Sequence, residues 1–246
     1  FGNGTEVIEG VKARKEALFA DLLVALDVLE EAPRFRISSI EPNLLTDEII
    51  DFVAESRCFM PHFHVPLQSG NDKQLREMRR RYRRDLYTAR VERIRRKMPH
   101  ACIGCDVIVG FPGETEADFL ETYRYLQALE VSYLHVFTYS ERANTPAVML
   151  PGVVPVEERR LRNQSLRGLS EIKRRAFYTQ HLNTVRPVLF EQHRDRDRLT
   201  GFTDNYIKIE APAAAGAVNT LQPVLLSALH CQGEFVLAQA TAPCHV

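Results

Sequence analysis

Short runs of β-branched and apolar residues alternate with longer helical patterns from residue 11 to about residue 183. The runs at 36–40, 62–65, 103–109 and 133–137 are typical of strands, and the segments between them repeat apolar residues at helical spacing. Strands that alternate with helices form βαβ units around a parallel sheet. About four such units cannot close an eight-stranded barrel, which needs roughly 250 residues. The pattern therefore predicts an open, partial α/β barrel.

The sequence changes in character after about residue 184. Helical periodicity ends, and short apolar runs follow at 187–191, 206–210, 224–229 and 234–238, separated by glycines and an Asp-Asn pair. Short strands joined by tight turns are typical of a small antiparallel β-barrel. We therefore expect two domains, residues 1–183 and residues 184–246.

Composition narrows the setting of the protein. The 246 residues include five scattered cysteines, which favours a reducing compartment, the cytoplasm, and no disulfide framework. No apolar run approaches the roughly 18 residues that cross a bilayer, so no membrane partner is expected. The first residue is Phe1 and not Met, which we interpret as the sign of a piece cut from a longer protein.

Charge is distributed unevenly although the net charge is zero. Residues 1–56 carry twelve acids and five bases, whereas residues 73–97 carry twelve bases and three acids. A basic segment of this kind can bind a polyanion such as RNA. The alternative is a solvated helix face, whose arginines pair with the acidic N-terminal segment or cover apolar surface with their stems.

Two groups of residues suggest metal binding. Cys102 and Cys105 have the spacing of a metal clamp, but on a strand an offset of three places the two sulfur atoms on opposite faces. His62 and His64 share a strand face, and Asp106 and His135 on later strands could complete a metallohydrolase site. In the alternative interpretation these histidines only form hydrogen bonds inside a polar barrel mouth.

Residues 110–115, Gly-Phe-Pro-Gly-Glu-Thr, join an expected strand to a helix that opens with a capping box from Thr115 to Asp118. Glycines let a ligand approach the backbone, and the free N–H groups of a helix start can bind an acceptor. No Gly-Lys-Ser/Thr is present, which excludes a nucleoside-triphosphate loop. The segment is either a loop for a nucleotide-like ligand or an ordinary tight turn.

Five segments occur together in an order that resembles one family: Ser38–Pro42, His64–Gly70, Met78–Tyr82, Asp106–Thr115 and Phe137–Arg142. The family is the radical S-adenosylmethionine (SAM) methylthiotransferases, which thiomethylate tRNA adenosines or a ribosomal protein. The resemblance covers essentially the whole chain and implies a partial radical-SAM barrel.

The tail of the chain extends this resemblance. Residues 201–207 resemble the TRAM domain, an OB-like RNA-binding barrel that ends these enzymes. Together with residues 38–42, they look closest to the branch that converts N6-threonylcarbamoyladenosine, next to the anticodon, to its 2-methylthio derivative.

The sequence departs from the family at the cluster ligands. The family holds one [4Fe–4S] cluster on a Cys-x-x-x-Cys-x-x-Cys loop and a second on an N-terminal domain, and neither group of cysteines occurs here. We expect that the chain lacks the first strand of the barrel and is catalytically inactive alone. No residue is assigned as catalytic or as a metal ligand.

The resemblance implies SAM and [4Fe–4S] clusters as cofactors of the parent enzyme, and the anticodon stem-loop of tRNA as its partner. Residues expected to bind the cofactor are Ser38, Glu41, Gln68, Ser69, Arg80, Ile108, Gly110, Pro112 and Glu114. Residues expected to contact the target RNA are Arg83, Arg84, Arg90, Tyr139, Ser140, Arg142, Thr145, Phe202 and Tyr206.

Three other functions stay open. A ribosomal-protein methylthiotransferase would use the same chemistry on another substrate. An RNA-binding module would keep the basic helix and the tail without turnover. A metal-dependent hydrolase would use the histidine group instead.

Overall fold

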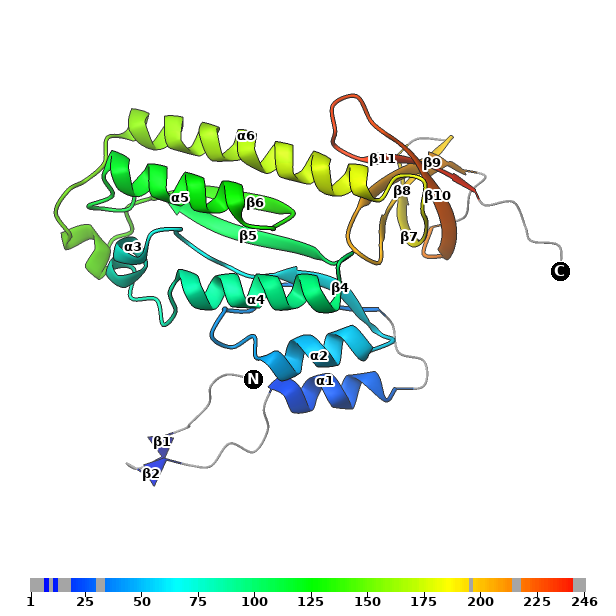
Figure 1. The fold of residues 1–246 in the computed structure, drawn as a ribbon, viewed down its shortest axis with the longest axis horizontal. Coiled ribbons are helices and arrows are strands. Elements are labelled where there is room, and N and C mark those ends of the chain that lie inside the picture. The colour runs from blue at the N-terminus through cyan, green and yellow to red at the C-terminus, as the bar shows by residue number, and fades with distance from the viewer. Residues whose placement is uncertain are drawn as a thin grey trace.

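The computed structural model describes residues 7–8, 11–12, 19–29, 34–194, 197–213 and 218–240. An α/β unit comes first and a β-barrel second, and one long helix runs from the former to the latter (Figure 1). The helices and first strands are β1 (Val7–Ile8), β2 (Val11–Lys12), α1 (Phe19–Asp27), β3 (Phe35–Ile37), α2 (Asp47–Glu55), β4 (Phe59–His64), α3 (Asp72–Glu77), α4 (Arg84–Lys97), β5 (Cys102–Val109), α5 (Glu116–Ala128), β6 (Tyr133–Thr138), η1 (Pro146–Met149) and α6 (Val156–Gln180). The barrel strands are β7 (Val185–His193), β8 (Arg198–Thr203), β9 (Lys208–Pro212), β10 (Leu221–Leu229) and β11 (Val236–Ala240). No helix in the described part of the chain is both long and apolar enough to span a membrane.

Strands β3, β4, β5 and β6 form an open, wholly parallel sheet in that order. This confirms the parallel α/β arrangement predicted from the alternation of strands and helices. Parallel neighbours need a crossover connection, and here each crossover contains a helix. The short antiparallel pair β1–β2 was not predicted and forms a separate sheet.

The sheet is buried on one face by helices. Ile103, Cys105, Val107 and Val109 of β5 belong to one apolar cluster with side chains from α2, α4, α5 and α6, such as Ile94. The alternate residues of β5 point to the other face, because side chains of a strand alternate. On that second face Asp106 and Ile108 lie outside the apolar cluster and are only partly buried, so this part of the face is available for polar groups.

Side chains next to the first turns of α5 and α2 cap these helices. The Thr115 side chain accepts a hydrogen bond from the N–H of Asp118, and the Asp118 carboxylate accepts one from the N–H of Thr115, which confirms the predicted capping box of α5. Thr46 caps α2 in a similar way by accepting from the N–H of Ile49.

The second unit is a closed barrel with the strand order β10-β11-β9-β8-β7. The predicted barrel is therefore present, but the expectation that it is antiparallel throughout was wrong, because β11 pairs with β9 in parallel. Strand β8 was also missed. Its glycine, Gly201, interrupts the apolar run, and it is needed because an added Cβ would lie 2.1 Å from the carbonyl oxygen of Leu189 on β7.

Helix α6 contributes to two apolar cores. Leu166 and Leu169 pack in the cluster of the α/β unit, whereas Phe177 and Tyr178, near its other end, pack among the barrel residues. Cys102 from the start of β5 also belongs to the barrel cluster. The two units therefore share apolar packing through α6 and the first residue of β5.

We expect Gly201→Ala to destabilise the protein by about 1–3 kcal/mol, because the new methyl group meets backbone that cannot move away. The matched control is Gly168→Ala, in the exposed middle of α6, where an added Cβ meets nothing within 4 Å. That change should stabilise the helix by about 0.5–1 kcal/mol. Urea unfolding measures both variants, and equal effects would contradict the packing described for β8.

Candidate active site

A cavity of about 790 Å³ lies at the carboxyl ends of β5 and β6. Its walls come from the loops after β4 and β6, the end of α3 and η1. Ligand sites of open α/β sheets lie at this edge of the strands. The structure brings a group of the predicted site residues together here: Gln68, Arg80, Ile108, Tyr139, Ser140, Arg142 and Thr145.

Two polar atoms at the cavity have no protein partner among the described residues. The Nε of Arg80 and the hydroxyl of Tyr139 are both buried, and neither forms a hydrogen bond. A buried polar group without a partner costs about 1–3 kcal/mol, and such groups often belong to ligand sites. The neighbouring Gln68 has a φ of 72°, an uncommon conformation for a residue with a side chain. These features fit a binding site for a polar ligand.

The cavity walls combine positive charge with aromatic rings. Arg76, Arg79 and Arg142 are exposed at the cavity, and none of them has an ion-pair partner within the described ranges. Phe111 and Tyr139 form an edge-to-face pair with ring centroids 5.3 Å apart. Arginine and aromatic rings together suit an anionic ligand that also has a flat ring.

Other residues predicted for the cofactor have structural contacts instead. Glu41 forms an ion pair with Arg80 at 3.1 Å, and Ser69 lies within hydrogen-bond distance of Thr122. Ser38 is exposed after β3, and Pro112 is buried in the turn after β5. None of these four side chains lines the cavity described above, and their cofactor roles stay predictions.

Gly110 and Glu114 hold the turn between β5 and α5. Gly110 has a φ of 75°, and an added Cβ would lie 2.3 Å from the side chain of Arg159. Its N–H donates to the Glu114 carboxylate, which also pairs with Arg162 at 2.7 Å. The Glu114 and Arg162 side chains are only 2% and 3% exposed. Burial raises the pKa of Glu114 despite the hydrogen bond from Gly110 and the charge of Arg162.

The arginines predicted to contact RNA are engaged within the protein. Arg84 pairs with Glu121 at 2.7 Å, and Arg90 pairs with Asp47 of the acidic N-terminal segment. Arg83 donates to the backbone carbonyls of Arg80 and Tyr82. The free positive charge at the cavity therefore comes from Arg76, Arg79 and Arg142, of which only Arg142 was predicted.

The barrel residues Phe202 and Tyr206 stack on each other with centroids 4.7 Å apart. Tyr206 also contacts His62 at 4.4 Å between centroids and lies under the guanidinium of Arg36 at 3.9 Å. Tyr206 thus packs at the junction of the barrel with the α/β unit. Its RNA contact stays a prediction.

The cysteines of the described chain do not form a group. Cys105 packs in the core of the α/β unit and Cys102 packs in the barrel cluster, which confirms their expected opposite orientation. Burial raises the pKa of each thiol to about 12. The two thiols lie in different apolar clusters, so they do not form the grouped thiolate set that holds an iron–sulfur cluster. Cys58 is buried elsewhere and Cys231 is exposed; Cys244 and the segment 1–4 lie outside the described residues.

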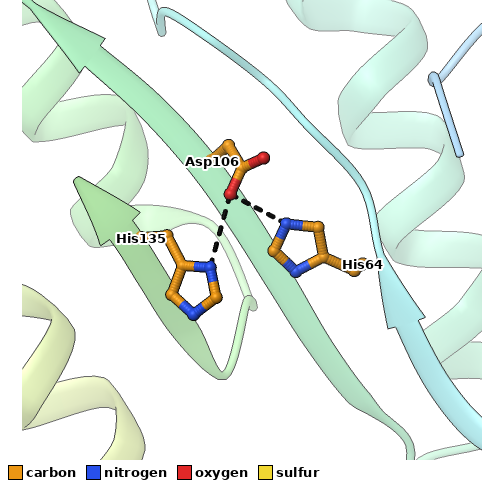
Figure 2. Close-up of side chains that lie close together, drawn as sticks. All are labelled: His64, Asp106 and His135. Atoms are coloured by element: carbon orange, nitrogen blue, oxygen red, sulfur yellow. Dashed lines mark hydrogen bonds and ion pairs between the residues drawn. The ribbon is translucent and has the colours of Figure 1, made fainter. Parts of the chain in front are cut away.

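The predicted residues His64, Asp106 and His135 do come together, on the face of the sheet opposite the apolar core (Figure 2). The Nε2 of His64 lies 2.8 Å from Oδ1 of Asp106, and the Nδ1 of His135 lies 3.5 Å from the same oxygen. Burial raises the pKa of Asp106, but the hydrogen bonds from His135 and His64 outweigh it and lower the pKa below its ordinary value. His62 is not part of this group. Burial lowers the pKa of His62 to about 3, and its Nε2 lies 3.1 Å from the Tyr133 hydroxyl.

Sequence reasoning missed several residues at the cavity, among them Arg76, Arg79, Phe111 and Phe137. Arg76 could have been found from the helix spacing of the basic segment, whereas Arg79 follows the end of α3 with a φ of 56° and has no such signal. Phe137 could have been found from the strand alternation that places it on the face of His135.

Comparison with known proteins shows similarity to radical SAM enzymes that modify tRNA. Residues 7–126 match the family model described as the radical SAM superfamily. This segment is therefore similar to radical SAM proteins. It is 37% identical over 200 residues to threonylcarbamoyladenosine tRNA methylthiotransferase MtaB of Bacillus subtilis, covering 79% of this chain and 44% of that protein.

Two other similar proteins are named for a different modified adenosine. The tRNA-2-methylthio-N(6)-dimethylallyladenosine synthase of Leifsonia xyli is 43% identical over 162 residues, 66% of this chain and 30% of that protein. The enzyme of the same name from Desulfitobacterium hafniense is 33% identical over 210 residues, 85% of this chain and 47% of that protein. The resemblance to methylthiotransferases is confirmed, and the chain spans less than half the length of these relatives.

We expect Glu114→Ala to destabilise the α/β unit by about 3 kcal/mol, because it removes the buried carboxylate that pairs with Arg162 and leaves only the partly exposed Glu158 and Glu116 near that guanidinium. Glu116→Ala is the matched control, since Glu116 lies 3.6 Å from the same arginine but is 65% exposed. It should cost less than about 1 kcal/mol. Chemical unfolding measures the difference. A folded Glu114→Ala protein of unchanged stability would show that Glu114 has no structural role.

Proposed function

We propose that this chain is part of a tRNA methylthiotransferase, and that the whole enzyme converts N6-threonylcarbamoyladenosine next to the anticodon to its 2-methylthio derivative. The observation that carries the proposal is the cavity at the strand ends, with its unpaired arginines and aromatic rings. A purine offers a flat ring and RNA offers phosphates, and these walls suit both. The similarity to the Bacillus subtilis relative supports the choice of modified adenosine.

The cofactor proposed for the same cavity is SAM. Its methionyl carboxylate is an acceptor for the buried Nε of Arg80, which lacks a protein partner among the described residues. Tyr139 offers a hydroxyl, and Ile108 offers an apolar surface beside it. Bound SAM would supply the adenosyl radical and the methyl group. The residues of this chain would orient it and keep bulk water from its ring.

The [4Fe–4S] cluster finds no ligand set among the described cysteines, so we derive no step through it. We propose that the chain alone has no turnover, and that the clusters belong to other parts of the enzyme. The barrel, which we propose is a TRAM domain, would add contacts to the anticodon stem-loop. We propose that the whole enzyme acts in the cytoplasm.

The test is binding of tRNA to the chain and to a triple variant, Arg76→Glu, Arg79→Glu and Arg142→Glu. We expect weaker binding and a flatter dependence on salt, because each lost phosphate contact lowers the slope by about one. The matched control reverses the same charge three times elsewhere, at Arg124, Arg160 and Arg167, which are exposed on α5 and α6. Equal loss in both triple variants would mean that binding follows net charge and not the cavity.

A second arm of the test separates the functions that remain open. Binding of tRNA that carries N6-threonylcarbamoyladenosine is compared with binding of the same tRNA without the modification. Tighter binding of the modified tRNA supports the proposal. Equal binding of both would favour a general RNA-binding module. Absence of tRNA binding at low salt, with binding of a ribosomal protein, would favour the protein-directed enzyme.

A further inference from the structure

Three neighbouring strands each place one possible metal-binding side chain on the face of the sheet opposite the apolar core. Asp106 of β5 is the register partner of His135 on β6, and His64 at the end of β4 pairs in register with Gly104. One ligand atom from each of His64, Asp106 and His135 lies within 4.8 Å of the others. Figure 2 shows the two imidazole rings on either side of the carboxylate, directed at one oxygen.

The spacing of these atoms is near that of a metal site. Metal–ligand bonds of about 2.0–2.2 Å at tetrahedral angles place the ligand atoms about 3.4 Å apart. The observed separations from Oδ1 of Asp106 are 2.8 Å to His64 and 3.5 Å to His135. A cation between them requires the carboxylate and the ring of His64 to separate by a few tenths of an ångström. His135 can adjust because its side chain is 56% exposed.

Neighbouring side chains orient His64, the most buried of the three proposed ligands. The Nδ1 of His64 lies 3.3 Å from the Tyr133 hydroxyl, so the ring is held with its Nε2 toward Asp106. A hydrogen bond at the second ring nitrogen is the usual support of a histidine that binds a metal. The Tyr133 hydroxyl is in turn held by Nε2 of His62 at 3.1 Å. The site therefore has both ligands and a supporting layer.

We propose that His64 Nε2, the Asp106 carboxylate and His135 Nδ1 bind one divalent first-row transition-metal ion, such as Zn²⁺, Fe²⁺ or Co²⁺. Two imidazoles and one carboxylate suit these ions better than Mg²⁺ or Ca²⁺, which need oxygen ligands. Three protein ligands leave a coordination position open, as in catalytic and not in structural sites. The exposed side of His135 is where water or a small oxygen or nitrogen donor would bind.

The position of the site relates it to the cavity. Ile108 and Phe137, which line the cavity, lie two residues beyond Asp106 and His135 on the same face of the same strands. Two residues along a strand span about 7 Å. A ligand in the cavity could therefore approach the open position. The metal proposal does not rest on the proposed methylthiotransferase function, because it concerns only the binding of an ion.

The experiment is a titration of the chelator-treated chain with Co²⁺, followed by visible absorption, and with Zn²⁺, followed by calorimetry. We expect one ion per chain. His135→Ala and Asp106→Asn should each weaken binding by about 100-fold, and Tyr133→Phe by about 10-fold through loss of the support on His64. His135 is largely exposed and Asp106→Asn keeps its shape, so both variants should fold; circular dichroism checks this.

The matched control is the double variant His230→Ala and Cys231→Ser, which removes the exposed His–Cys pair of the barrel with Nε2 and Sγ 3.7 Å apart. Its metal binding should equal that of the unmodified chain, and the Co²⁺ spectrum should lack the intense near-ultraviolet band of a thiolate ligand. Absence of binding, or binding that is unchanged in His135→Ala and Asp106→Asn, would overturn the proposal. The group would then be a hydrogen-bonded triad only.

Discussion

The two-residue alternation of β5 is the constraint on which the rest of the α/β unit depends. Its odd-numbered side chains, such as Val107, complete the core under the helices, and Asp106 and Ile108 lie on the opposite face, outside that core. Because the strand lies between β4 and β6, its neighbours must follow the same alternation. One pattern thus separates the packing residues from the residues available for chemistry.

Much of the fold could be predicted because it depends on local pattern. The strands and helices of the α/β unit follow from periodicity, and the start of α5 follows from the side chains of Thr115 and Asp118. The barrel was harder, since strand direction there depends on pairing between distant segments. The parallel pair of β9 and β11 and the strand around Gly201 have no local signal.

The candidate site could be predicted only in outline. Residues that follow strands, such as Gln68 and Tyr139, line the cavity because parallel strands end at one edge, and their binding roles stay predictions. Residues in charged segments could not be assigned in this way. Arg90 and Arg142 look alike in the sequence, but Arg90 lies opposite Asp47 across two packed helices, whereas Arg142 follows β6 and remains unpaired within the described residues. Ion pairing of this kind depends on tertiary packing, which charge counts do not contain.

Helix α6 connects the cavity loops with the barrel. Its first turns contact the cavity loops, where the Arg159 guanidinium donates to the backbone carbonyl of Tyr139, and its last turns are embedded in the barrel core through Phe177. A helix of 25 residues is about 37 Å long at 1.5 Å per residue. The helix therefore sets the distance between the cavity and the barrel core. A nucleoside can occupy only one of them at a time, and a single ligand that reaches both must be about as long as the helix, which is the length of a macromolecule.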